Sequence, residues 1–154
     1  MLHSIISQIG FLWMSAVCLF AFFKGGFVER AAAAVVSLSW ALTLALSFVL
    51  SGLFSRQVEE FTFLGVDALT AIALLALALR FAKLWLGGAM LMQSAELALH
   101  GAVMAEWGLS FRDYMIWNNL LTTGLLLIIA YATAVFWCRR SRRRSAPPNT
   151  IAHA

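Results

Sequence analysis

From Phe61 to Ala105 the chain reads FTFLGVDALTAIALLALALRFAKLWLGGAMLMQSAELALHGAVMA. This apolar segment is longer than one membrane helix can use, because about 20 residues cross a hydrocarbon core of roughly 30 Å. Arg80 and Lys83 lie near its middle, where a turn at the membrane surface would expose both charges to water. We therefore expect two membrane spans here, at about 61–79 and 84–105, joined by a short basic loop.

Three further apolar runs extend the pattern, at about 5–23, 31–54 and 114–138. Each has the length of a membrane-spanning helix and ends at charged or small polar residues. Of the 154 residues, 62% are hydrophobic and only 12% are charged, which is too little polar surface for a water-soluble globule. The expected fold is all-α: a polytopic transmembrane bundle of five spans forming one domain, residues 1–138, followed by a basic, disordered tail, residues 139–154.

Positive charge is shared unevenly between the two ends of these spans. Nine of the eleven Lys and Arg residues fall on the side that holds the C-terminus: Lys24, Arg30, Arg80, Lys83, Arg139, Arg140, Arg142, Arg143 and Arg144. The other side has Arg56 and Arg112, together with Trp107 and Tyr114 at the position of an aromatic belt. Because basic loops stay in the cytoplasm, the sequence predicts an outside N-terminus and a cytoplasmic C-terminus, as in a multi-pass protein of the bacterial inner membrane.

The second span carries a ridge of small, weakly polar side chains. Ser39, Thr43, Ser47 and Ser51 repeat at four-residue spacing, which places them along one side of a helix. Helices in lipid associate through close packing at small residues and through hydrogen bonds. We therefore interpret this ridge as a helix-packing surface rather than as the lining of a pore.

Polar side chains interrupt the fourth span, and their spacing gives them one direction. Gln93, Glu96 and His100 fall within about 60° of arc on a helix that advances about 100° per residue. They lie about 8–18 Å below the outer surface. Asp67 in the third span lies at about 9 Å in the same leaflet, and the fifth span adds polar side chains at about 6–14 Å: Asn118, Asn119, Thr122 and Thr123. An unpaired ionisable group in hydrocarbon costs at least about 2.5–3.5 kcal/mol, so we expect these side chains to face one another.

Four uses of this polar cluster are open from the sequence. A carboxyl group beside an imidazole can take up and release protons. Asp67, Glu96 and His100 could hold a divalent cation through two oxygens and one nitrogen, although the paired-histidine motif is incomplete. A small ligand could enter from the outside and meet the amides of Asn118 and Asn119. The fourth use is structural, with polar pairing that joins the helices.

Other chemistry is not expected from the sequence. Haem held between two histidines is disfavoured because His100 is the one histidine inside a predicted span, and no other cofactor is predicted. No set of nucleophile, base and orienting group is apparent, which disfavours an enzyme. The arginines from 139 to 144 suit anionic lipid headgroups and a topology anchor, so nucleic acid is not expected as a partner.

Several residues carry a resemblance to known proteins. They are Glu29 and Arg30 at the start of the second span, Asp67 in the third, Gln93 and His100 in the fourth, and Tyr114 and Trp117 in the fifth. In this order of elements the chain resembles a group of small bacterial multi-span inner-membrane proteins to which no chemistry is assigned. The resemblance covers most of the chain and implies the multi-span architecture.

From these features we expect a non-enzymatic accessory or interaction subunit of a membrane assembly, because the loops are short and no soluble domain is present. Its expected partners are the lipid bilayer and other membrane subunits or a second copy of the chain. The alternative is a small proton-coupled carrier, or a cation- or ligand-binding membrane protein, that uses the polar cluster.

Overall fold

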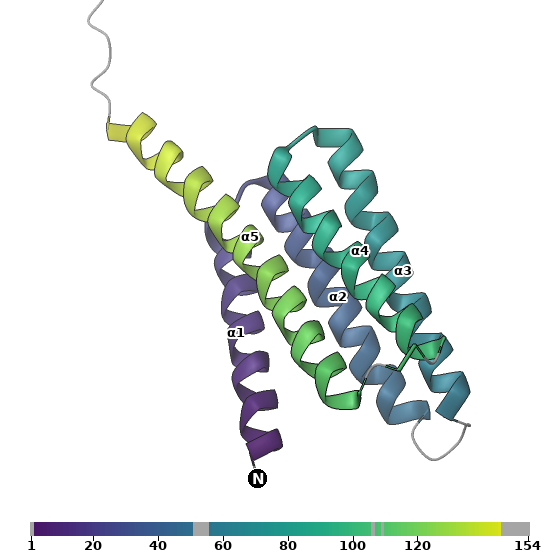
Figure 1. The fold of residues 1–154 in the computed structure, drawn as a ribbon. Helices are drawn as coiled ribbons and strands as arrows, with labels where there is room; N and C mark the ends of the chain where they lie inside the picture. Colours follow the sequence, from purple (N-terminus) through teal and green to yellow (C-terminus); the bar gives the residue numbers. More distant parts are fainter. Residues whose placement is uncertain (1, 51–55, 106, 109, 146–154) are drawn as a thin grey trace, which may run out of the picture.

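The structure is a computed structural model that describes residues 2–50, 56–105, 107, 108 and 110–145. It contains five α-helices in these residues, which confirms the all-α prediction (Figure 1). The helices are α1 (Leu2–Lys24), α2 (Phe27–Leu50), α3 (Arg56–Phe81), α4 (Leu84–Met104) and α5 (Phe111–Ser145). Each helix follows one of the five apolar runs of the sequence.

Three of these helices are long and apolar enough to cross a membrane. The qualifying segments are Phe27–Leu50 in α2, Val58–Phe81 in α3 and Arg112–Arg144 in α5. Gln93, Glu96 and His100 interrupt the apolar sequence of α4, and the apolar part of α1 whose side chains are described, Gly10–Lys24, is shorter. The bundle therefore has three helices with the properties of membrane spans, while the count of five stays a prediction.

The helices run alternately up and down and close into a ring. Each helix packs against the next one in the chain, and α1 returns to pack against α5 (Figure 1). The helix α4 lies between α3 and α5 and has the most extensive packing with both. Because the direction alternates, the N-terminal ends of α3 and α5 lie at the same end of the bundle as the C-terminal end of α4.

The core is small and apolar. Leu74, Leu86, Leu126 and Ile129 are fully buried, and alanines such as Ala33 let the helix backbones approach closely. Many large apolar side chains remain on the outside of the bundle, including Phe48 on α2, Leu79 on α3 and Leu127 on α5, the three membrane-length helices. That distribution suits a molecule whose outer surface meets lipid rather than water.

The turn between α1 and α2 explains why α2 begins at Phe27 rather than near residue 31. The Gly26 backbone N–H donates to Oε2 of Glu29 over 3.1 Å, so a glutamate at the third helical position caps the N-terminus. A side chain on Gly25 would collide with the backbone oxygen of Ala21 and with Cβ of Glu29. The Lys24-Gly25-Gly26 sequence thus ends one helix and starts the next within a tight reversal.

Among the described positions of the predicted ridge on α2, Ser39 forms a hydrogen bond to α3. The Thr70 hydroxyl lies 2.7 Å from the Ser39 hydroxyl, which joins the two helices by a hydrogen bond. The hydroxyls of Thr43 and Ser47 donate to backbone carbonyls of α2 itself, at Ser39 and Leu44. Ser51 lies outside the described residues.

The C-terminal basic segment differs from the prediction of a disordered tail. The helix α5 continues through the five arginines to Ser145, whereas the sequence predicted disorder from residue 139. Arginine is a good helix former, and cations near a helix C-terminus interact favourably with the helix dipole, so this segment extends the apolar helix instead of ending it. Residues 146–154 lie outside the described part of the chain.

Candidate functional site

Polar side chains from three helices meet near the end of the bundle where α3 and α5 begin. On α4, Gln93 and Glu96 are buried, with 3% and 7% of their surfaces exposed. His100 follows one helical turn after Glu96 and is half-buried. Because α4 lies between α3 and α5, its polar face can reach both neighbours. This polar cluster consists of Asp67, Gln93, Glu96, His100, Tyr114 and Thr122.

The contact at the centre of the cluster joins Asp67 to His100. Oδ2 of Asp67 lies 2.6 Å from Nδ1 of His100, and the two side chains are 20% and 21% exposed. Within the described residues, Nδ1 has no hydrogen-bond partner besides this carboxylate contact. Asp67 therefore fixes the orientation of the imidazole from the side of α3.

The other nitrogen of the same imidazole contacts α5. The Tyr114 hydroxyl lies 2.7 Å from Nε2 of His100, and the two rings are inclined to each other with centroids 5.3 Å apart. A neutral imidazole has one N–H and one acceptor nitrogen. When Nδ1 holds the proton and faces Asp67, Nε2 accepts from the tyrosine hydroxyl; when both nitrogens are protonated, Nε2–H donates to the phenol oxygen. His100 thus links a carboxylate and a phenol from two different helices.

A second polar contact lies one turn deeper along α4. The Thr122 hydroxyl lies 2.5 Å from Oε1 of Glu96 and 3.0 Å from the backbone oxygen of Asn118. The Gln93 side chain also interacts with the Glu96 carboxyl group. One hydroxyl carries one proton, so Thr122 can donate to Glu96 or to Asn118, and in the second case a protonated Glu96 is the donor. The pair can therefore accommodate both protonation states of the carboxyl group.

Four of the predicted site residues come together through their side chains, and the two asparagines of α5 do not. Asp67, Glu96, Gln93 and His100 come together as described above. Asn118 takes part through its backbone carbonyl, and Asn119 is exposed on α5. No group of three or more His, Cys, Asp or Glu side chains in the described residues has an arrangement that could hold a metal ion.

One member of the cluster, Tyr114, was not among the predicted site residues. The sequence assigned Tyr114 to an aromatic belt because it lies near a helix end. Tyr114, Asn118 and Thr122 repeat at four-residue spacing, so they share one face of α5. That spacing was the signal in the sequence that could have brought the tyrosine into the site.

An apolar layer closes the cluster toward the other end of the bundle. Going away from the polar residues, the three helices present buried apolar side chains: Leu74 on α3, Ala89 and Leu86 on α4, and Leu126 and Ile129 on α5. Met92 also packs beside Gly124, with Sδ 3.3 Å from the position that a Cβ would occupy. Apolar side chains thus lie between the cluster and the other end of the bundle.

Comparison of the chain with protein-family models, with curated proteins and with solved structures gave no match. The resemblance to small bacterial membrane proteins therefore stays a prediction, and the side chains of the cluster carry the functional argument.

Proposed function

We propose that this chain is a five-span protein of the bacterial inner membrane, with its N-terminus outside and its C-terminus in the cytoplasm. The three membrane-length helices and the alternating direction of all five support this topology. At one end of the bundle lie the basic residues of the α1–α2 turn, of the α3–α4 turn and of the last turns of α5. Under the positive-inside rule that end is cytoplasmic, and the polar cluster faces outward.

The function we propose is reversible proton binding from the outer side by Asp67, His100 and Tyr114. The observation that carries this proposal is the placement of the His100 imidazole, which lies 2.6 Å from a carboxylate and 2.7 Å from a phenol hydroxyl. Histidine changes charge near neutral pH, and both of its ring nitrogens already have a partner in this arrangement. A proton can therefore be taken up or released with little movement of side chains.

The geometry also suggests a direction for the exchange. Tyr114 is the fourth residue of α5 and stands nearest the end of the bundle, while Glu96 and Gln93 lie deeper. The apolar layer of Leu74, Leu86 and Ile129 lies beyond them. Uptake and release through the same outer opening fit a protein that senses or couples to external pH better than one that conducts protons across the membrane.

A structural accessory role is the second candidate, and the exposed apolar side chains of α2 favour it. The ridge already meets α3 through Ser39 and Thr70, whereas large apolar side chains such as Phe48 remain exposed on α2. A helix that packs against them would belong to another membrane subunit or to a second copy of the chain. In this role the polar cluster would only hold α3, α4 and α5 together.

Nitrogen NMR of the imidazole separates these candidates. Full-length protein carrying ¹⁵N-histidine is placed in nanodiscs, and the His100 signals are assigned by their loss in a His100→Gln variant. We expect the shifts of both His100 ring nitrogens to respond to pH as the imidazole binds and releases a proton. We expect Asp67→Asn to alter that response, because Nδ1 loses its carboxylate contact. Glu59→Gln, which removes the same charge from α3 outside the cluster, is the matched control and should leave the response nearly unchanged. His100 signals that do not respond to pH would favour the structural role.

A further inference from the structure

A second site lies at the opposite end of the bundle, where the α1–α2 turn meets the last turns of α5. An open cavity of about 340 Å³ is lined there by four basic side chains, Lys24, Arg30, Arg140 and Arg144. Phe23, Trp137 and Ser141 complete the lining. The basic groups come from three helices, so the fold gathers charges that are far apart in the sequence.

Local contacts hold two of these cations in place. Nζ of Lys24 lies 5.5 Å from the centroid of the Trp137 ring, a cation–π contact that ties the end of α1 to α5. Nε of Arg30 donates to the backbone oxygen of Gly25 over 3.1 Å. That bond fixes the guanidinium group and leaves its terminal nitrogens as donors toward the cavity.

In the part of the chain that the structure describes, no carboxylate pairs with the positive charge of this cavity. The nearest acidic residue in the sequence, Glu29, is buried and accepts from the Gly26 backbone N–H. Four cations around one cavity repel one another, and a bound anion would relieve that repulsion.

From this arrangement we propose that the cavity binds a phosphate-bearing anion, with Lys24, Arg30, Arg140 and Arg144 as its ligands. Arginine guanidinium groups match phosphate oxygens with paired hydrogen bonds, and lysine adds a compact charge. The volume suits a phosphate group with part of a headgroup rather than a lone small ion. Phe23 and Trp137 add an apolar wall of the kind found at the level of lipid headgroups. The proposal is independent of the proton site.

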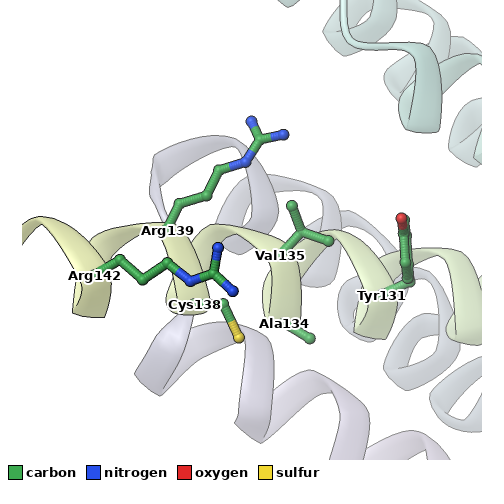
Figure 2. Close-up of a pocket in the computed structure, with 6 residues that line it drawn as sticks. All are labelled: Tyr131, Ala134, Val135, Cys138, Arg139 and Arg142. Atoms are coloured by element: carbon green, nitrogen blue, oxygen red, sulfur yellow. The ribbon is translucent and has the colours of Figure 1, made fainter.

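The chain offers a matched control for this site on the same helix. Figure 2 shows Arg139 and Arg142 beside Tyr131, Ala134, Val135 and Cys138, where they line a different open cavity of about 310 Å³. The double variant R140Q/R144Q and the double variant R139Q/R142Q remove the same charge from the same segment of α5. They differ in whether the lost arginines face the four-cation cavity.

The experiment measures binding of two probes to the purified full-length chain. Native mass spectrometry in detergent measures retention of diphosphatidylglycerol, a lipid with two phosphates, against the zwitterionic lipid phosphatidylcholine. Calorimetry measures binding of inorganic pyrophosphate. We expect R140Q/R144Q to weaken binding about tenfold or more and R139Q/R142Q to weaken it less than about threefold. Lys24→Gln, on a different helix, should weaken binding in the same sense as R140Q/R144Q.

The two probes distinguish the source of the phosphate. Retention of the lipid without binding of pyrophosphate assigns the site to a lipid headgroup, and pyrophosphate that binds and displaces the lipid assigns it to a soluble phosphate. Equal losses in the two double variants would mean that charge alone attracts the anion, and this would overturn the proposal. Unchanged binding in R140Q/R144Q, or no binding of either probe by the unaltered protein, would also overturn it.

Discussion

Nδ1 of His100 lies 2.6 Å from Oδ2 of Asp67, so two ionisable side chains from neighbouring helices are in direct contact inside a largely apolar bundle. The contact joins α3 to α4 at the level where Tyr114 joins α4 to α5. Three helices thus converge on a single imidazole.

This contact predicts energetic coupling between Asp67 and His100. In a double-mutant cycle with Asp67→Asn and His100→Gln, we expect a coupling of about 1 kcal/mol or more in the free energy of unfolding, because each variant leaves the other side chain without its partner. Denaturant unfolding in detergent, followed by circular dichroism, measures it. A cycle that pairs Glu59→Gln with His100→Gln is the control and should give less than about 0.5 kcal/mol. Additive effects of Asp67 and His100 would contradict the contact.

The Thr122 hydroxyl should contribute to stability through Glu96. Thr122→Val keeps the shape of the side chain and removes the hydroxyl that lies 2.5 Å from Oε1 of Glu96. We expect a loss of about 1–3 kcal/mol, since a buried carboxyl group loses its partner. Thr123→Val, at the exposed neighbouring position, should change the unfolding free energy little. Similar losses at the two positions would argue against a special role for Thr122.

The turn between α1 and α2 should not tolerate a side chain at Gly25. A Cβ there would meet the backbone oxygen of Ala21, which cannot move without unwinding the end of α1. We expect Gly25→Ala to lower the thermal unfolding temperature. Gly87→Ala is the comparison, because a Cβ at Gly87 has open space and alanine favours the helix. The prediction fails if the two variants unfold at the same temperature.

The turn between α3 and α4 contains a backbone position, occupied by Ala82, that glycine would adopt more easily than alanine. Ala82 has a φ of 46°, in the left-handed region that alanine adopts at a cost, and its N–H donates to the Ala78 oxygen over 2.9 Å. We expect Ala82→Gly to stabilise the protein by about 0.5–1 kcal/mol. Ala76→Gly, at an exposed position within α3, should destabilise it by a similar amount. The same denaturant unfolding measures both variants, and loss of stability in Ala82→Gly would contradict this account of the turn.

The apolar layer beneath the cluster predicts that the protein alone does not conduct protons. Liposomes that contain the purified protein and a pH-sensitive dye should hold an imposed pH gradient as long as empty liposomes do, because buried apolar side chains such as Leu74, Leu86 and Ile129 offer no group that binds a proton. A protonophore added at the end serves as the positive control. Faster decay that depends on His100 would show a path through the layer and would replace the proposal of exchange on one side.

Part of the cluster could be predicted from the sequence because helix periodicity is a local property. Gln93, Glu96 and His100 share a face of α4 whatever surrounds that helix, and their approximate depth follows from the residues between them and the helix end. The sequence did not reveal that Tyr114 belongs to the site. A tyrosine near a helix end also fits an aromatic belt, and which of its neighbours it meets depends on the rotation of α5.

The sequence by itself determined five apolar helices, their turns near charged or glycine residues, and the one-sided polar face of α4, since each depends on residues close together in the chain. Only the tertiary structure decided that the two nitrogens of His100 meet Asp67 and Tyr114, and that Lys24 and Arg30 share a cavity with Arg140 and Arg144. The physical reason is that periodicity fixes the direction of a side chain relative to its own helix. The packing of small and large side chains between helices fixes how each helix is turned toward its neighbours.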